Sequence, residues 1–173
     1  MRIFATSLAI ALISAPAWAA PDTTQVLGSF QTWAAYSAGS GEQKVCYAMA
    51  SPKASVPKKK RDKNYFMISD WPNRPDKAKG EIEIWPGYKY KEDSKVTLQV
   101  GAAKFTLFAK NDGDNGTAWV KDLPDEQPII NAMRAGSTVV VTGISSRGTT
   151  IKDTFPLAGL PDALQKAHDA CGL

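Results

Sequence analysis

Residues 137–155 read STVVVTGI, SSRG and TTIKDTF, and this stretch carries the clearest fold signal in the chain. The runs Ser137–Ile144 and Thr149–Phe155 are rich in β-branched residues, which favour the extended conformation of strands. The four residues between them, Ser145–Gly148, are typical of a tight hairpin connection. We therefore predict two neighbouring antiparallel strands in this stretch.

The same pattern continues towards the N-terminus, where alternating or β-branched runs are separated by Gly, Pro and Asn. Gly101-Ala102-Ala103 is predicted to form a second tight connection, and Asn115-Gly116 a turn further along. The spacing suits an antiparallel sandwich or barrel better than βαβ units, which need a helix between each pair of strands. The other predicted strands are Phe30–Tyr36, Lys44–Ser51, Asn64–Asp70, Gly80–Trp85, Lys95–Val100, Lys104–Ala109 and Thr117–Val120.

Two helices are predicted among the strands. Asp125 is suited to capping the first helix, which ends at Gly136. The second helix begins near Pro161 and ends before Gly172, and its apolar stripe turns Cys171 towards the core. The predicted fold is mainly β: an antiparallel β-sandwich or barrel-like domain with one short inserted helix and a C-terminal helix.

The N-terminus has the three parts of a secretory signal peptide: Arg2, the apolar run Ile3–Ile13 and the small-residue site Ala17-Trp18-Ala19. The run is shorter than the ~20 apolar residues that span a bilayer. We predict cleavage after Ala19, so that residues 1–19 are signal peptide and residues 20–173 form a single domain. The mature chain is then periplasmic or secreted, without a transmembrane segment.

The chain contains two cysteines, Cys46 and Cys171. A redox dithiol needs a short spacing such as Cys-x-x-Cys, and these two lie far apart in the sequence. In an oxidising compartment they are predicted to form a structural disulfide between an early strand and the final helix. In the chain-entropy model, closing so long a loop stabilises the folded state by about 4–5 kcal/mol.

No catalytic, cofactor-binding or metal-binding residues are predicted. His168 is the one histidine of the sequence and both cysteines are predicted to be oxidised, so nucleophilic catalysis and zinc chemistry lack their residues. Asp112–Gly116 resembles the opening of a calcium loop, but Thr117 stands in place of that loop's glycine. Glu81 and Glu83 alternate with isoleucines, which favours the solvent face of an edge strand over a catalytic pair.

The formal net charge is +4, and the charge is unevenly placed: residues 53–63 are strongly basic and residues 112–126 mostly acidic. The centre of the basic segment is a run of four cations: Lys58, Lys59, Lys60 and Arg61. Such a run attracts anions with salt-sensitive affinity, here lipid headgroups, lipopolysaccharide phosphates or acidic partner proteins. The simpler interpretation is a solvated loop that contributes little to the fold. No aromatic residues interleave the cations, so nucleic acid is not predicted as a partner.

Several short motifs follow one another in a fixed order along the chain. They are Trp33, Val45-Cys46-Tyr47, Tyr65–Ser69, Gly87-Tyr88, Lys104–Phe108, Ala118-Trp119, Gly136–Gly143, Ser146–Thr149, Asp153–Phe155 and the final helix ending in Cys171. Together they resemble the invasion-associated locus B family of bacterial envelope proteins over nearly the whole mature chain. The resemblance implies a small, exported, disulfide-bearing protein, and it transfers no catalytic or ligand-binding residues to this chain.

We therefore expect a non-enzymatic, exported envelope protein without a cofactor, which binds another envelope component or contributes to host-cell interaction. The alternative is an enzyme or enzyme inhibitor that acts on envelope polymers. That function requires carboxylates to converge in a deep pocket, either Glu81 with Glu83 or Asp112 with Asp114. A ligand that stacks on Trp71, which precedes a proline in a predicted loop, is a further alternative.

Overall fold

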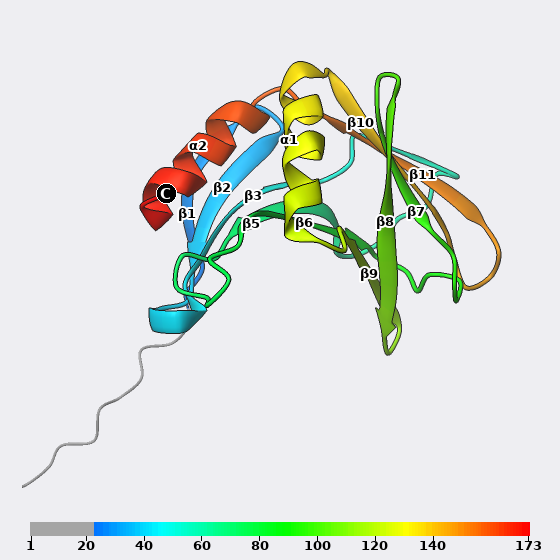
Figure 1. Ribbon diagram of the computed structural model, residues 1–173. Coiled ribbons are helices and arrows are strands. Elements are labelled where there is room, and N and C mark those ends of the chain that lie inside the picture. Colours follow the sequence, from blue (N-terminus) through cyan, green and yellow to red (C-terminus); the bar gives the residue numbers. More distant parts are fainter. Residues whose placement is uncertain (1–22) are drawn as a thin grey trace, which may run out of the picture.

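The computed structural model describes residues 23–173, so the predicted signal peptide lies outside the described residues. Within them the chain forms eleven strands and two α-helices (Figure 1). The strands are β1 (Gln25–Phe30), β2 (Trp33–Ala38), β3 (Val45–Ala50), β4 (Ala54–Val56), β5 (Asn64–Asp70), β6 (Lys79–Pro86), β7 (Val96–Val100), β8 (Ala103–Asp112), β9 (Asn115–Trp119), β10 (Thr138–Ile144) and β11 (Thr150–Pro156). The helices are α1 (Glu126–Ala135) and α2 (Leu160–Cys171), and short 3-10 helices lie at Gly41–Gln43 and Leu123–Asp125. Among the described residues, no helix has the length and apolar character needed to cross a membrane.

All strand pairs are antiparallel, and the strands form one continuous sheet in the order β1-β2-β3-β5-β6-β9-β8-β7-β10-β11-β4. Figure 1 shows that this sheet curls into a half-barrel. Tight connections join many of the neighbours. The predicted hairpin connection at Ser145–Gly148 is confirmed, and so is the one at Gly101-Ala102-Ala103, although Ala103 already pairs with Val100 as the first residue of β8. The predicted mainly β class with an inserted helix and a C-terminal helix is confirmed, and the curled sheet is compatible with a sandwich or barrel-like arrangement.

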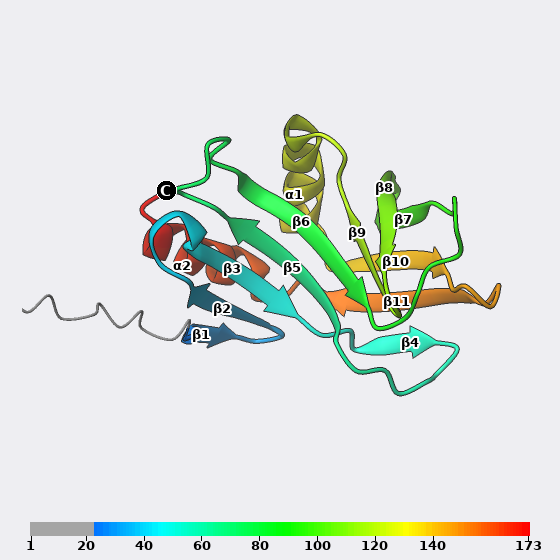
Figure 2. The same cartoon turned by 90° about the horizontal axis from the view of Figure 1, so that it is seen from below.

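Both helices pack against the same side of the sheet. α2 contacts β1, β2, β3 and β5, and α1 contacts β6. Figure 2, viewed from below, shows β3, β5 and β6 in front of both helices, so neither helix covers that face of these strands. Core residues alternate along the strands, as Ile82 and Ile84 do in β6. Phe66 of β5 contacts the rings of Trp33 and Phe155, with centroids 5.8 and 5.6 Å away, so β2, β5 and β11 share one core.

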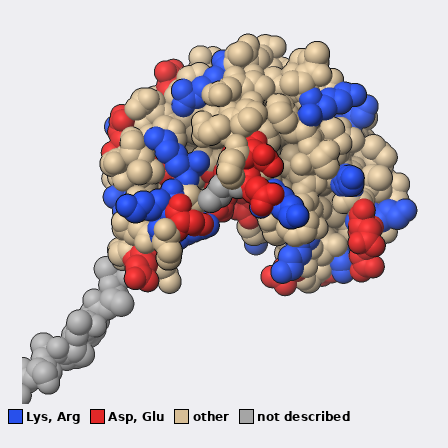
Figure 3. Space-filling view, in the orientation of Figure 1, with Lys and Arg blue, Asp and Glu red and all other residues tan. Residues whose placement is uncertain are grey.

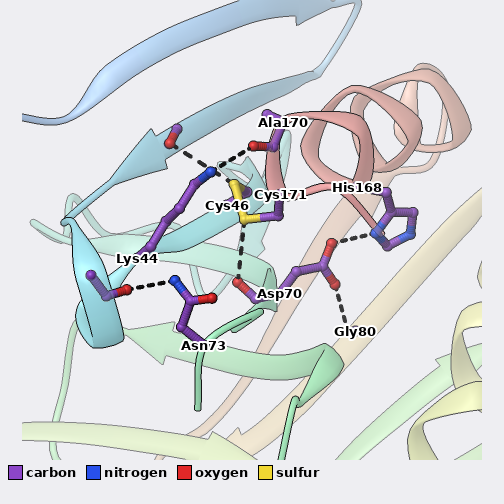
Figure 4. The surroundings of a disulfide bond; sticks show 10 residues. Lys44, Cys46, Asp70, Asn73, Gly80, His168, Ala170 and Cys171 are labelled. Carbon is purple, nitrogen blue, oxygen red and sulfur yellow. Dashed lines mark hydrogen bonds and ion pairs between the residues drawn. A yellow bond between two sulfur atoms is a disulfide. The ribbon is translucent and has the colours of Figure 1, made fainter.

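A disulfide joins Cys46 of β3 to Cys171 at the end of α2, which is the pairing predicted from the sequence. Both cysteines are buried, and Ala167, one turn earlier in α2, packs against them. Beside the bond, the Nζ atom of Lys44 donates a hydrogen bond of 3.0 Å to the carbonyl oxygen of Ala170 (Figure 4). These contacts hold the last turn of α2 on β3.

The start of α2 is packed equally closely, against the turn between β1 and β2. The indole Nε1 of Trp33 donates a hydrogen bond of 2.9 Å to the carbonyl oxygen of Pro156, at the end of β11. Gly159, which precedes α2, has φ +88°, and a Cβ at this position would lie 1.8 Å from the carbonyl oxygen of Phe30. Glycine is therefore required here both by the backbone conformation and by the close approach.

One predicted strand and one predicted turn are wrong. The predicted strand Phe30–Tyr36 is a hairpin of β1 and β2 that reverses at Gln31-Thr32, where Gln31 has φ +54°. This turn lacks the Gly, Pro, Asn and Asp residues by which turns are recognised. The predicted turn Asn115-Gly116 is the start of β9, because the chain reverses two residues earlier and Asn115 pairs with Asp112.

The helix boundaries agree with the sequence to within about a residue, but the predicted cap does not. Asp125 belongs to a 3-10 helix and makes no capping hydrogen bond through its side chain. Gly136 ends α1 as predicted, and its N–H donates a hydrogen bond to the carbonyl oxygen of Met133. α2 begins at Leu160, and Gly172 follows its last residue in the left-handed conformation.

Candidate functional site

A cleft of about 590 Å³ lies beside the basic run that the sequence singles out. β4 holds the start of this segment on the sheet, because Ala54–Val56 pairs with Lys152–Thr154 of β11. The loop between β4 and β5, the two residues that follow β6 and the turn between β10 and β11 line the cleft. Its charged lining residues are Lys59, Lys60, Arg61, Asp62, Lys63 and Arg147.

The expectation that the whole basic run is a solvated loop that contributes little to the fold is wrong for Arg61. Its side chain is 6% exposed and forms a bidentate ion pair with Asp153 of β11, whose side chain is 5% exposed. Arg61 also donates hydrogen bonds to the carbonyl oxygen of Pro86 (2.6 Å) and to Oγ of Ser55 (2.8 Å). A buried charge is tolerated when it is paired and fully hydrogen-bonded, and removing its partner is strongly destabilising. Arg61 is therefore a structural anchor, and its charge is already compensated.

The residues that follow β6 fix one wall of the cleft. Gly87 has φ +69°, and a Cβ there would lie 2.4 Å from the carbonyl oxygen of Asp62, so glycine allows the basic loop to approach this closely. The guanidinium of Arg61 lies 5.5 Å from the ring centroid of Tyr88, a cation–π contact. Burial and the nearby charge of Asp153 raise the pKa of Tyr88, so its phenol remains a neutral hydrogen-bond donor in the cleft.

Four cations of the cleft have no such compensation. Among the described residues, no carboxylate lies within ion-pair distance of four lining side chains: those of Lys59, Lys60, Lys63 and Arg147. Asp62 is the one acid in the lining. A concave surface with a surplus of one charge attracts ligands of the opposite charge, so this cleft is suited to anions such as phosphate groups.

The cleft agrees only in part with the four cations predicted as an anion contact. Lys59 and Lys60 line it, Arg61 anchors its base through Asp153, and Lys58 is exposed but does not belong to the lining. Sequence reasoning missed Lys63 and Arg147 as members of the site. Arg147 comes from the turn between β10 and β11, and only its place in a polar turn indicated that it is exposed.

The acidic candidates are placed differently from the prediction. Glu81 and Glu83 do not lie on an edge strand, because β6 is flanked by β5 and β9 within the sheet. Both side chains are half-buried and line a second pocket, of about 460 Å³, together with Glu126. Figure 3 shows acidic side chains gathered around the hollow beneath α1. Asp112 and Asp114 are exposed at the turn between β8 and β9 and line neither pocket.

Glu126 is a buried carboxylate that the sequence analysis missed. It is the first residue of α1 and is 1% exposed, and its Oε1 accepts a hydrogen bond of 2.9 Å from the N–H of Ile82. Its Oε2 has no hydrogen-bond partner among the described residues. Burial, reinforced by the charge of Glu81, raises the pKa of Glu126 to about 7. An acid at a helix N-terminus is ordinarily explained by the helix dipole, so the sequence held no distinctive signal for this role.

His168, in the last turn of α2, contacts the end of β5. Its Nδ1 is paired with Oδ2 of Asp70, which is 2% exposed, and Oδ1 of Asp70 accepts a hydrogen bond of 2.9 Å from the N–H of Gly80 (Figure 4). Cys171, one turn further along α2, is in the disulfide and is not a nucleophile. Trp71 is half-buried rather than the exposed platform considered above, and the guanidinium of Arg74 lies 5.3 Å from its ring centroid.

Three comparisons with known proteins bear on this fold and these sites. A family model described as invasion associated locus B (IalB) protein matches residues 33–168. No curated protein matches the chain at a significant level. Among solved structures, the crystal structure of invasion associated protein B from Bartonella henselae superposes with a TM-score of 0.60 at 16% identity, covering 86% of this chain and 99% of that chain. At this identity, the superposition shows a shared fold.

Proposed function

Because this chain belongs to the invasion-associated locus B family, we propose that it is an exported, non-enzymatic protein of the bacterial cell envelope that binds an anionic envelope component. The observation that carries the proposal is the cleft of about 590 Å³ with its four uncompensated cations. The disulfide and the signal-peptide pattern of residues 1–19 support export. Any contribution of this chain to host-cell interaction then depends on that binding.

The ligand that fits this cleft best carries several phosphate groups on one small headgroup. Lys59, Lys60 and Lys63 lie within five residues of one another on the loop, and Arg147 comes from another segment. The Arg61–Asp153 pair holds the base of this loop, so less conformational entropy is lost when an anion binds than on a free loop. Lipopolysaccharide phosphates and anionic lipid headgroups have this chemistry.

Binding to vesicles tests the proposal. The mature protein is titrated with vesicles of equal parts phosphatidylglycerol and phosphatidylethanolamine, and with the same vesicles carrying lipopolysaccharide, at low and at high salt. In the cleft variant, four residues are changed to serine: Lys59, Lys60, Lys63 and Arg147. In the control variant, four exposed lysines outside the cleft are changed to serine: Lys89, Lys91, Lys104 and Lys110.

Both variants lose four charges, so the comparison separates a site from net charge. We expect salt-sensitive binding by the wild type and the control, and a strong loss in the cleft variant, because the contact is Coulombic and is screened within ~10 Å at 0.1 M salt. Equal losses in the two variants, or full binding by the cleft variant, would overturn the proposal. Preference for one vesicle type distinguishes lipopolysaccharide from phospholipid.

The alternative function, an enzyme or enzyme inhibitor acting on envelope polymers, is favoured by one observation: Glu81 and Glu83 line one pocket together with Glu126. Glu81 is held by Arg74, whose Nη1 donates a hydrogen bond of 2.9 Å to its Oε2, so it is not a free acid or base. Turnover of peptidoglycan or polysaccharide fragments by the wild type, abolished in Glu83→Gln, would establish this alternative.

A further inference from the structure

We propose that the pocket beside the start of α1 binds a small organic cation that carries a primary ammonium group. This pocket has a volume of about 460 Å³ and shares no lining residue with the basic cleft. The proposal therefore goes beyond the proposed function and does not depend on it. Its charged lining residues are Arg74, Asp76, Glu81, Glu83, Lys121 and Glu126.

The first argument is the buried oxygen of Glu126 that has no partner. Oε1 of this carboxylate accepts the N–H of Ile82, while Oε2 is buried without a hydrogen-bond partner among the described residues. A buried acceptor without a partner is costly, and most such groups in folded proteins are satisfied. Because Glu126 lines the pocket, a ligand bound there with a hydrogen-bond donor is placed to satisfy Oε2 after a small rotation of the carboxylate.

The second argument is the charge that the pocket leaves uncompensated. Arg74 is already engaged: its Nε donates a hydrogen bond of 3.0 Å to Oδ1 of Asp76, and its Nη1 bonds Glu81. Within residues 23–173, neither Glu83 nor Glu126 lies within ion-pair distance of a cation. Lys121, the other cation of the lining, is exposed and forms no ion pair with either carboxylate. Buried carboxylates are normally paired with a positive group, so a cationic ligand is suited to supply the missing partner.

The third argument is the aromatic wall. Trp119 of β9 lines the pocket, and its ring is held edge-to-face by Phe108, at a centroid distance of 5.0 Å and an interplanar angle of 85°. Tryptophan is the aromatic side chain that attracts cations most strongly over its ring face. Carboxylates and an indole in one pocket therefore favour an organic ammonium group, and an ammonium group with N–H donors supplies both the positive charge and the hydrogen bond that Oε2 lacks.

Calorimetric titration with cadaverine (1,5-diaminopentane) tests the proposal. Wild type is expected to bind it with 1:1 stoichiometry at pH 8, and Glu126→Gln to bind about tenfold more weakly or worse, as expected for loss of a charge-assisted hydrogen bond. The amide retains an oxygen for the N–H of Ile82, so the substitution preserves the local fold. Glu92→Gln, in an exposed loop outside the pocket, is the matched control and is expected to bind like wild type.

Two further measurements make the test specific. Pentamethonium, 1,5-bis(trimethylammonio)pentane, has the same carbon chain and the same two charges as cadaverine but no hydrogen-bond donor, and it is expected to bind more weakly. Since burial raises the pKa of Glu126 to about 7, cadaverine is expected to bind more weakly at pH 6 than at pH 8, and the difference is expected to shrink in Glu126→Gln. The proposal fails if cadaverine does not bind, if Glu126→Gln binds it like wild type, or if pentamethonium or a neutral oligosaccharide binds as well. The vesicle assay of the basic cleft is unaffected by any of these outcomes.

Discussion

Arg61→Ala is expected to destabilise the protein strongly, although Arg61 belongs to a lysine-rich loop. The substitution leaves the buried carboxylate of Asp153 without a cation, and it also removes the hydrogen bond that Arg61 donates to the carbonyl oxygen of Pro86. Breaking a buried ion pair by removing one partner costs about 3–5 kcal/mol, because the remaining charge stays buried and unpaired. The expected loss in the free energy of unfolding is therefore about 4 kcal/mol.

Urea unfolding followed by tryptophan fluorescence measures this loss. With an m-value of about 2 kcal/mol/M, typical of a domain of this size, the midpoint is expected to fall by about 2 M. The matched control is the variant with serine at Lys58, Lys59 and Lys60, which carries three changes in the same loop. Those side chains are exposed, so its unfolding free energy is expected to stay within about 0.5 kcal/mol of wild type.

A second variant separates the ion pair from simple loss of side-chain volume. Arg61→Ala combined with Asp153→Asn removes the orphaned charge and is expected to recover part of the lost stability. The reasoning is refuted if Arg61→Ala costs less than about 1 kcal/mol, which is the range of an exposed ion pair. Such a result would mean that water reaches Asp153 and that the loop is a solvated connector.

Three other predictions concern the disulfide, the buried carboxylate and the close approach before α2. Replacing Cys46 and Cys171 by serine is expected to cost up to about 4–5 kcal/mol and to lower the melting temperature by roughly 10 °C, and an unchanged calorimetric transition would contradict this. The native pKa of Glu126, raised from 4.5 to about 7, means that the folded state holds a proton which the unfolded chain releases. The free energy of unfolding is therefore expected to fall by up to about 3 kcal/mol as the pH rises from 5 to 8. Urea titrations at pH 5 and pH 8 measure this difference, and it is expected to be much smaller in Glu126→Gln. Gly159→Ala is expected to lower the free energy of unfolding by more than about 2 kcal/mol, because its Cβ meets a carbonyl oxygen of β1. Gly148→Ala is the control: its φ is +81° but the space around it is open, so a cost of about 1 kcal/mol is expected. Equal shifts of the melting temperature in the two variants would be inconsistent with the close approach at Gly159.

The regular parts of the fold were predictable because their side chains alternate between core and surface. β5 was predicted with its observed limits, Asn64–Asp70, and most other strands to within a few residues. β4 was not, because Ala54–Val56 is too short for a pattern and owes its place to pairing with β11. The hairpin at Gln31-Thr32 was missed because tertiary packing, rather than turn chemistry, holds the reversal.

The candidate sites were less predictable than the fold. A cluster of lysines in the sequence indicates an exposed, positively charged segment. The burial of Arg61 within that segment depends on its ion pair with Asp153, a residue 92 positions away. Glu126 has no distinctive sequence context. Its carboxylate is buried against β6, where it accepts a hydrogen bond from the N–H of Ile82, a residue 44 positions earlier in the chain. The local sequence indicated which segments are charged. Which of these charges remain unpaired depends on residues far apart in the sequence that the curled sheet brings together.

The packing of α2 on β1, β2 and β3 has a consequence for the order in which the chain becomes folded. A protein emerges from the ribosome with its N-terminus first, so the first three strands are present long before residues 160–171 are made. Until then the apolar faces of these strands have no cover, and contacts so distant in sequence form slowly. Chains that lack α2 are therefore expected to remain unfolded, and the twelve residues of this helix commit the polypeptide to its native state.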